Sequence, residues 1–290
     1  MHLKIILVAL MSMLVIVESD EIRIGAYNVL KFGKTFWSNP EKAAALTEVV
    51  KKYDLIVIQE IVEESEASIY KLMYRLHIDE NLPSMALHLS PRLGRTSYKE
   101  QYGIIYRSDK LNLLKFYQHT NQTMFERPPL FLSFEWMSKV EVAPQIGIVI
   151  PPTNPIKFSL ITMHASADTI GTDQELNSLA EIWLNYKSKL KNSIIIGDLN
   201  ADCSYVTDSD RSELTFWTSS DYSFLIGNDD DTTTESTHCA YDRIIYTGTE
   251  LESHLVDGSN RVYKFEDFED PITTAKLLSD HCPVEVKLKN

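Results

Sequence analysis

The fold of this sequence is decided by Leu55-Ile56-Val57-Ile58-Gln59-Glu60, a run of four apolar residues followed at once by two polar ones. A strand that is apolar at every position predicts a place in the middle of a sheet that is covered on both faces. Functional side chains of α/β proteins commonly lie where such strands end. The run therefore predicts a buried central strand, and Gln59 and Glu60 mark the edge at which a site would form.

The segments around this run predict a strand, helix, strand order. Alternating apolar residues over 22–26 are typical of a half-buried strand. Ser38-Asn39-Pro40 then opens a helix, because it supplies a capping residue and a proline for the first turn. Apolar residues at helical spacing predict another helix over 69–76, and later apolar runs predict strands over 103–106 and 131–136.

The second part of the chain repeats this order. Strands are predicted over 158–163, 194–196, 244–246 and 284–288, and a helix is predicted over 176–190. The first of these strands runs into His164, and the second runs into Gly197-Asp198-Leu199-Asn200. The sequence thus predicts an α/β fold with two similar halves and no linker between them.

The charge balance limits the kinds of partner. The 290-residue chain has 28 Lys and Arg against 41 Asp and Glu, which gives a net charge of −13. A partner held chiefly by a basic surface field is therefore not expected. If this protein handles nucleic acid, local groups and metal ions must offset its own charge.

The N-terminus predicts export. Lys4 precedes an apolar run over 5–17, and Val17-Glu18-Ser19 supplies a cleavage sequence of the signal-peptide kind. The run is shorter than the about 20 apolar residues of a membrane-spanning helix, although a retained anchor stays open as the alternative. We expect a signal peptide over 1–19, a folded domain over 20–290 and a secreted, extracellular protein.

Export also permits covalent modification. The chain has three cysteines, of which two could pair in an oxidising compartment and leave one over. Asn121-Gln122-Thr123 is a sequon, so Asn121 is an expected glycosylation site.

Polar residues gather at the ends of the predicted strands. Each of them alone could cap a strand or begin a loop, and for any single residue that is the better interpretation. Together they supply hard oxygen ligands for Mg²⁺ or Ca²⁺ and imidazoles that move protons near neutral pH, which is what metal-assisted hydrolysis requires. The cluster consists of Asn28, Gln59, Glu60, His164, Asp198, Asn200, Asp242, Asp280 and His281.

Four longer motifs carry a resemblance to a known family. They are Leu93-Gly-Arg-Thr-Ser-Tyr-Lys-Glu100, Gly197-Asp-Leu-Asn-Ala-Asp-Cys-Ser-Tyr-Val206, Cys239-Ala-Tyr-Asp-Arg-Ile244 and Ser279-Asp-His-Cys-Pro-Val-Glu-Val286. From Ile22 to its end the chain resembles the secreted deoxyribonuclease I family, within the metal-dependent endonuclease/exonuclease/phosphatase superfamily. The resemblance implies a two-sheet sandwich flanked by helices, the four-layer fold of that family.

The resemblance also implies a role for every residue of the cluster except Gln59. His164 and His281 would be the paired acid and base, with Glu100 orienting His164 and Asp242 orienting His281. A carboxylate beside a histidine fixes the tautomer of the imidazole and holds its pKa in the working range. The ligands of the divalent metal and the scissile phosphate would be Asn28, Glu60, Asp198, Asn200 and Asp280.

Substrate contacts and supporting sites follow from the same resemblance. Tyr98 and Arg127 match groove-contacting residues of the family, and Tyr241 matches a phosphate-contacting tyrosine. Cys203 and Cys239 match a disulfide of the family, which leaves the third cysteine buried and inert. A structural calcium loop is implied at Asp231, Thr233, Glu235 and Thr237.

Two departures from the family pattern are also present. Val62 stands where the family typically has an arginine that enters the minor groove, and Glu63 and Glu64 follow it. The segment 119–125 lacks the second cysteine pair of the family and the acidic residues of its second calcium site. One calcium site is therefore expected. Binding of DNA is expected to be weaker than in relatives that carry the arginine.

The expected function is a secreted endonuclease that hydrolyses double-stranded DNA with little sequence specificity and leaves 5′-phosphate ends. Mg²⁺ (or Mn²⁺) and Ca²⁺ are the expected cofactors, and a monomer with no stable protein partner is expected. Two alternatives stay open: a phosphoesterase acting on a phospholipid or inositol phosphate, and a catalytically inactive DNA-binding relative. Tyr98, Arg127 and Tyr241 argue against the first, and the complete set of imidazoles and ligands argues against the second.

Overall fold

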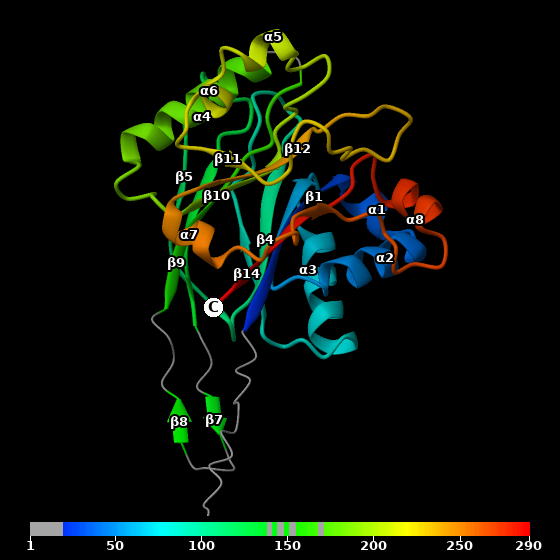
Figure 1. The fold of residues 1–290 in the computed structure, drawn as a ribbon. Helices are drawn as coiled ribbons and strands as arrows, with labels where there is room; N and C mark the ends of the chain where they lie inside the picture. The colour runs from blue at the N-terminus through cyan, green and yellow to red at the C-terminus, as the bar shows by residue number, and fades with distance from the viewer. Residues whose placement is uncertain (1–19, 138–140, 144–147, 151–154, 168–170) are drawn as a thin grey trace, which may run out of the picture.

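Two mixed sheets of six strands each form the centre of the computed structural model (Figure 1). The structure describes residues 20–290 except 138–140, 144–147, 151–154 and 168–170. The predicted signal peptide, residues 1–19, lies outside the described residues. The expected two-sheet sandwich flanked by helices is confirmed.

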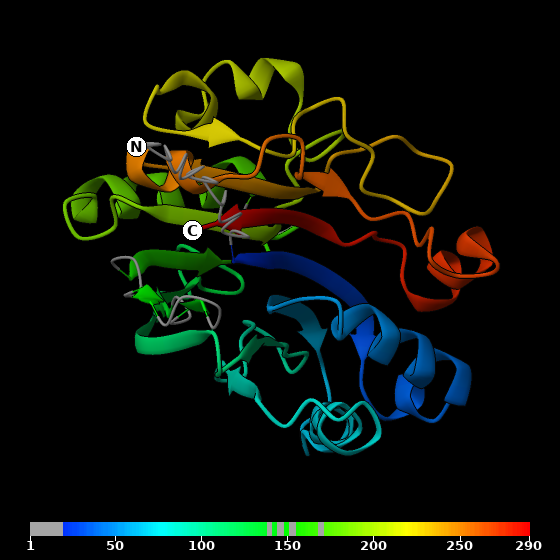
Figure 2. The ribbon, with the colours of Figure 1, turned by 60° about the horizontal axis from the view of Figure 1, so that its bottom comes forward.

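The first sheet has the strand order β13-β14-β1-β2-β4-β3. Its strands are β1 (Glu21–Phe32), β2 (Leu55–Ile61), β3 (Met85–Leu89), β4 (Gln101–Arg107), β13 (Arg261–Val262) and β14 (Val284–Lys289). β1 runs parallel to β2 and antiparallel to β14. Figure 2 shows this joining of the two ends of the chain, with β1 in blue beside β14 in red.

The second sheet has the order β11-β12-β10-β9-β6-β5. Its strands are β5 (Leu111–Gln118), β6 (Leu130–Trp136), β9 (Ile156–Thr162), β10 (Ser193–Asp198), β11 (Ser223–Phe224) and β12 (Asp242–Thr247). β9 and β10 are parallel, and β10 and β12 are antiparallel. A separate pair, β7 (Glu141–Ala143) and β8 (Ile148–Ile150), forms a two-stranded sheet.

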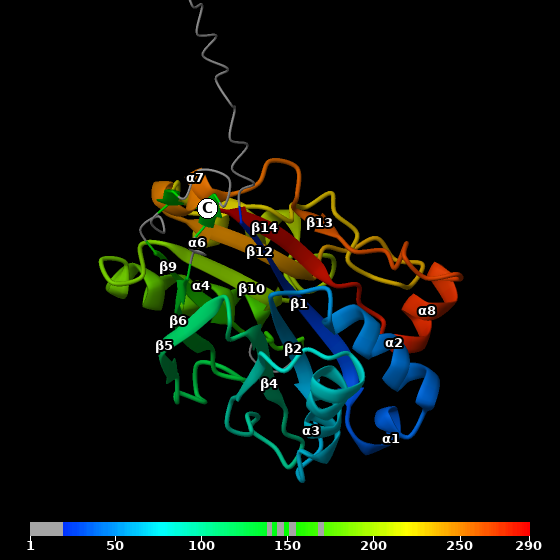
Figure 3. The same ribbon diagram turned by 90° about the horizontal axis from the view of Figure 1, so that it is seen from below.

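Helices form the outer layers (Figure 3). Those against the first sheet are α1 (Lys34–Trp37), α2 (Pro40–Val50), α3 (Ala67–Tyr74) with a π-turn η1 (Arg75–Asp79), and α8 (Pro271–Leu278). The second sheet is covered by α4 (Thr172–Tyr186) and α6 (Thr215–Thr218), near the short α5 (Asp208–Arg211), and α7 (Thr249–His254) follows β12. In the described part of the chain, every helix is too short or too polar to cross a membrane.

Strand β2 shows why the deciding run is apolar at every position. Leu55 and Val57 face the core between the two sheets, whereas Ile56 and Ile58 face the core between the first sheet and its helices. All four side chains are buried. Burial of each such side chain is worth about 1.5–3 kcal/mol, so only apolar residues stabilise both layers. The predicted central strand is confirmed.

The two sheets do not divide the chain into two halves as the sequence pattern suggested. β5 and β6 come early in the chain but lie in the second sheet, beside β9. β13 and β14 come last but lie in the first sheet, beside β1. The predicted helix over 176–190 ends at Tyr186. Strand β5 was not predicted, because most of its side chains are partly or fully exposed.

Candidate active site

Strands of both sheets bring the predicted site residues to one edge of the sandwich. Asn28 lies in β1 and Glu60 in β2 of the first sheet, while Asp198 ends β10 of the second sheet. Asn28 Nδ2 donates hydrogen bonds to Glu60 Oε1 and to Asp198 Oδ2, both at 3.0 Å. The amide therefore joins the two sheets at the site.

Each predicted catalytic histidine is bound to its predicted carboxylate. Nδ1 of His164 lies 2.7 Å from Oε2 of Glu100, and Nδ1 of His281 lies 2.8 Å from Oδ2 of Asp242. All four residues are buried. A carboxylate at Nδ1 fixes the ring and leaves Nε2 as the atom that exchanges a proton.

Both Nε2 atoms converge on one buried carboxylate. Oδ2 of Asp198 lies 3.4 Å from Nε2 of His164 and 3.5 Å from Nε2 of His281. The site therefore has two carboxylate–imidazole pairs whose Nε2 atoms approach the same oxygen of Asp198. Such an arrangement can take a proton at one imidazole and give a proton at the other.

The electrostatics of the site follow from burial and these contacts. Burial lowers the pKa of His281, but the Asp242 and Asp198 carboxylates outweigh burial and raise it to about 10. Burial and the charge of Arg127 lower the pKa of His164, yet its neighbouring carboxylates raise it overall. Burial raises the pKa of Asp198, but both imidazoles hold it below its usual value. Burial likewise raises the pKa of Asp242, although the His281 imidazole opposes this shift.

The oxygen atoms of the site fit a divalent cation. Oδ1 of Asn28 and Oδ1 of Asp242 are buried and have no hydrogen-bond partner among the described residues. Ligand atoms of Asp198, Asp242 and His281 lie within 4.8 Å of one another. Carboxylate and amide oxygens are the ligands that Mg²⁺, Mn²⁺ and Ca²⁺ prefer. An unpaired buried acceptor is costly, and a bound cation would satisfy it.

Three other predicted ligands lie around this centre. Glu60 and Asn200 have φ angles of 60° and 48°, a left-handed conformation that is costly for residues with a Cβ and is found at functional sites. Oε2 of Glu60 accepts from the Lys31 amide at 2.8 Å, and Asn200 Nδ2 donates to the Ala165 carbonyl at 3.0 Å. Asp280 is half-exposed, with Oδ1 4.0 Å from His281 Nε2.

Comparison with known proteins places the chain in a family. The model of the endonuclease/exonuclease/phosphatase family matches residues 25–281. Deoxyribonuclease-1 of Bos taurus is 34% identical over 278 residues, covering 92% of each chain. Deoxyribonuclease-1 of Gallus gallus is 32% identical over 295 residues, covering 99% of each chain. The chain belongs to the deoxyribonuclease I family.

Solved structures share the fold of this deoxyribonuclease I family member at much lower identity. A D. rerio TDP2 structure complexed with single-strand DNA product is 13% identical, has a TM-score of 0.63, and matches over 93% of this chain and 99% of its own. The human Nocturnin catalytic domain is 14% identical with a TM-score of 0.59, over 94% and 98% of the two chains. These likenesses concern the fold alone.

The predicted DNA-contacting residues of this deoxyribonuclease I family member differ in their exposure and in their contacts within the protein. Tyr98 is 46% exposed. Tyr241 packs against His281, with ring centroids 6.2 Å apart, and against Tyr205 at 5.5 Å. Arg127 has only 12% of its side chain exposed, since its guanidinium donates to backbone carbonyls and lies 3.4 Å from Glu100. Arg127 therefore also supports the segment of the predicted catalytic His164.

Sequence reasoning missed two residues that hold the His164 segment. Tyr102 Oη accepts a hydrogen bond from the backbone N–H of His164 at 3.0 Å. Gln59 Nε2 donates to the carbonyl of Met163 at 2.8 Å. Gln59 was recognised only as a polar strand end, and the one signal for Tyr102 was its place two residues after Glu100.

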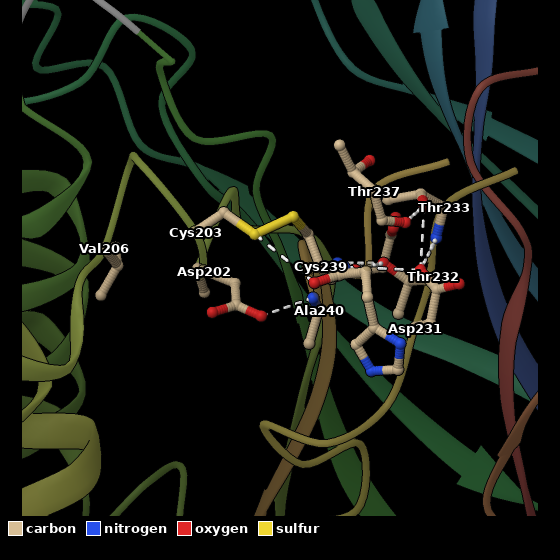
Figure 4. Close-up of a disulfide and its surroundings, with 12 residues drawn as sticks. Asp202, Cys203, Val206, Asp231, Thr232, Thr233, Thr237, Cys239 and Ala240 are labelled. Carbon is tan, nitrogen blue, oxygen red and sulfur yellow. Dashed lines mark hydrogen bonds between the residues drawn. A yellow bond between two sulfur atoms is a disulfide. The ribbon is translucent and has the colours of Figure 1, made fainter. Parts of the chain in front are cut away.

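The predicted disulfide of this deoxyribonuclease I family member is present (Figure 4). Cys203 and Cys239 are bonded, with Cα atoms 5.8 Å apart. Beside it, the Asp202 carboxylate accepts from the backbone N–H of Ala240 at 2.7 Å. Cys282 is a free, buried thiol, as expected. Burial raises its pKa to about 12, so the thiol is inert at neutral pH.

Three of the four predicted calcium ligands meet in the loop that this disulfide closes (Figure 4). Thr233 Oγ1 lies 2.9 Å from Asp231 Oδ1 and 2.8 Å from the Thr237 carbonyl. Glu235 is exposed. Nζ of Lys264 lies 2.7 Å from the Asp231 carbonyl and 3.7 Å from its Oδ2. The oxygens can hold a cation, but a lysine ammonium already offsets part of their charge.

The predicted glycosylation site lies in a tight turn. Oδ1 of Asn121 accepts from the backbone N–H of Thr123 at 2.9 Å and from its hydroxyl at 2.6 Å. Asn121 is partly exposed. Glycosylation of Asn121 stays a prediction.

Proposed function

We propose that the protein is a secreted, divalent-metal-dependent endonuclease that hydrolyses the phosphodiester bonds of double-stranded DNA. It acts with little sequence specificity and leaves 5′-phosphate ends. One observation carries the proposal: Nε2 of His164 and Nε2 of His281 both face Asp198, and each imidazole is backed by its own carboxylate. The Deoxyribonuclease-1 relatives, 32–34% identical, support DNA as the substrate.

The two imidazoles supply the proton transfers. One Nε2 accepts a proton from the water that attacks phosphorus, and the other gives a proton to the departing 3′ oxygen. Glu100 and Asp242 keep both rings in the required orientation, at 2.7 and 2.8 Å from Nδ1. In-line attack and departure require groups on opposite sides of the phosphate, and the two imidazoles are proposed to take these two positions.

Asn28, Glu60, Asp198, Asn200 and Asp280 would hold a divalent cation, with Mg²⁺ or Mn²⁺ as the proposed ion. When bound, such an ion stabilises the negative charge that develops on the phosphate. The residues of the chain meanwhile position the phosphate between the histidines. Because the chain carries a net charge of −13, the bound cation would also offset repulsion between protein and DNA.

Tyr98 and Tyr241 are proposed to contact the DNA from the two sides of the site. Tyr98 is exposed beside the Glu100 segment, whereas Tyr241 packs on His281. Arg127 is proposed to contribute positive charge at the groove while it holds the His164 segment. A calcium ion bound at Asp231, Thr233 and Thr237 would support the loop near Tyr241. We propose a monomer without a stable protein partner.

Nicking of supercoiled plasmid by the mature chain tests this function. Relaxed circles are expected in the presence of Mg²⁺ and Ca²⁺, and a chelator is expected to abolish them. The new ends should accept DNA ligase without prior phosphorylation, because they carry 5′-phosphates. Metal-dependent release of phosphate from an inositol phosphate or phospholipid without nicking would overturn the proposal.

A further inference from the structure

The peptide bond between Met163 and His164 lies just beyond the end of a sheet. Strand β9 ends at Thr162, and its pairing with β10 and β6 also ends there. The following peptide therefore has no strand partner in its own sheet, although His164 bears the imidazole of the site. Met163 is fully buried, and His164 is 6% exposed. A buried peptide needs hydrogen-bond partners from elsewhere.

Both polar groups of this single peptide unit are bound by side chains of the opposite sheet. Gln59 Nε2, from β2, donates to the Met163 carbonyl at 2.8 Å. Tyr102 Oη, from β4, accepts from the N–H of His164 at 3.0 Å and donates to the Arg127 carbonyl at 2.9 Å. Gln59 and Tyr102 are both completely buried. The peptide is thus held on its carbonyl side and its amide side at once.

Gln59 also holds Asp198, which lies in β10 of the second sheet. Its Oε1 accepts the backbone N–H of Asp198 at 2.7 Å. The approach is close because Gly197 has no side chain: a Cβ there would lie 2.6 Å from Gln59 Nε2 and 2.8 Å from the Met163 carbonyl oxygen. One amide therefore connects the backbones that carry His164 and Asp198.

We propose that Gln59 and Tyr102 are positioning residues that together set His164 and Asp198 relative to the first sheet. The site is divided between the sheets. Asn28, Glu60 and Glu100 come from the first sheet or its edge. His164 and Asp198 come from the second sheet or its edge. A small shift of one sheet would lengthen the 2.7 Å contact between His164 and Glu100. The two side chains limit this shift without touching the substrate.

The test compares Tyr102→Phe and Gln59→Met with Tyr53→Phe. Tyr53 is a matched control, because its buried hydroxyl also makes a hydrogen bond, to Glu285 Oε2 at 2.7 Å. Plasmid nicking in Mg²⁺ gives kcat and KM, and thermal unfolding gives Tm. Loss of a buried hydrogen bond should lower Tm by a few degrees in all three variants.

We expect kcat to fall about 10- to 100-fold in Tyr102→Phe and Gln59→Met, because misplacement by about 1 Å costs about that much. KM should stay within about threefold, since neither residue binds DNA. Tyr53→Phe should keep its kcat. Because both residues hold one peptide, the loss in Tyr102→Phe/Gln59→Met should be smaller than the product of the single losses.

The proposal would be overturned by kcat values that fall no further than in Tyr53→Phe, or by losses that multiply fully in the double variant. The kcat readout rests on the proposed function, because it measures nicking of DNA. A second readout is therefore chosen that does not depend on activity. In ¹⁵N-histidine spectra, the His164 imidazole signals should shift in both variants and not in Tyr53→Phe. If the wild-type protein failed to nick plasmid, the function would fall, and these spectra would still decide the positioning role.

Discussion

Replacing Asp242 by Asn should remove most activity and leave the fold intact. The Asp242 side chain is fully buried, and its Oδ2 lies 2.8 Å from Nδ1 of His281. Asn has nearly the same volume, so the substitution removes the charge without opening a cavity. Burial lowers the pKa of His281, but Asp242 and Asp198 raise it to about 10. Without the Asp242 charge this pKa should fall.

The expected loss of activity follows from the role of the imidazole. A positioned proton transfer contributes about 10²- to 10⁴-fold, which is about 3–5 kcal/mol of barrier. We expect Asp242→Asn to lose activity in this range. Tm should fall, because the substitution removes the charged partner of a buried imidazole, but the matched volume of Asn should keep the protein folded.

Plasmid nicking and thermal unfolding check both expectations. Glu285→Gln is the control: Glu285 is equally buried, but its carboxylate is bound by Tyr53, Arg261 and Arg23 instead of a histidine. Nicking by Glu285→Gln should stay near the wild-type rate. More than a tenth of wild-type activity in a folded Asp242→Asn protein would refute the orienting role of this carboxylate.

Three further predictions concern the groove, the loop and the disulfide. Val62→Arg should lower KM for duplex DNA. It should also add up to about one unit to the slope of log affinity against log salt concentration, since each neutralised phosphate adds about 0.9. Steady-state kinetics at two salt concentrations check this, and an unaltered or raised KM would show that this loop does not approach DNA. Ca²⁺ should raise Tm, and Asp231→Ala should reduce this rise. Lys264→Gln should enlarge the rise, because the Lys264 ammonium lies 3.7 Å from the Asp231 carboxylate and competes with the cation. An unchanged calcium response in Asp231→Ala would contradict the proposed site. Joint replacement of Cys203 and Cys239 by Ser should lower the free energy of unfolding by about 3–4 kcal/mol, because the bond joins residues 36 positions apart; denaturant unfolding measures it, and a loss under about 1 kcal/mol would contradict the chain-entropy estimate.

The sequence allowed the central strands to be predicted because burial on both faces demands apolar residues at every position. This holds for Leu55–Ile61 and Ser193–Asp198, which lie in the middle of their sheets. The edge strands Met85–Leu89 and Leu111–Gln118 left no such pattern, because many of their side chains are partly or fully exposed. Which sheet each strand joins depends on contacts between distant segments, so the chain order suggested two halves that do not exist.

The pairing of each histidine with its carboxylate was predicted from motifs. The buried side chains that hold these residues in place were not. Glu100 and His164 are 64 positions apart, and only the family resemblance linked them before the structure did. The hold of Gln59 and Tyr102 on one peptide depends on how the two sheets face each other, which no local pattern contains. Arg127 likewise has the motif of a DNA contact, but most of its donors are engaged within the protein.

The most direct measurement is the nicking rate of His164→Ala and His281→Ala in Mg²⁺ at neutral pH, beside wild-type protein and with Tm recorded for each. Both imidazoles present Nε2 to Asp198, at 3.4 and 3.5 Å, so each should be needed for turnover. We expect both variants to lose about 10²- to 10⁴-fold in rate and to keep their Tm within a few degrees. If either folded variant retained more than a tenth of the wild-type rate, that histidine would not carry a proton in the reaction.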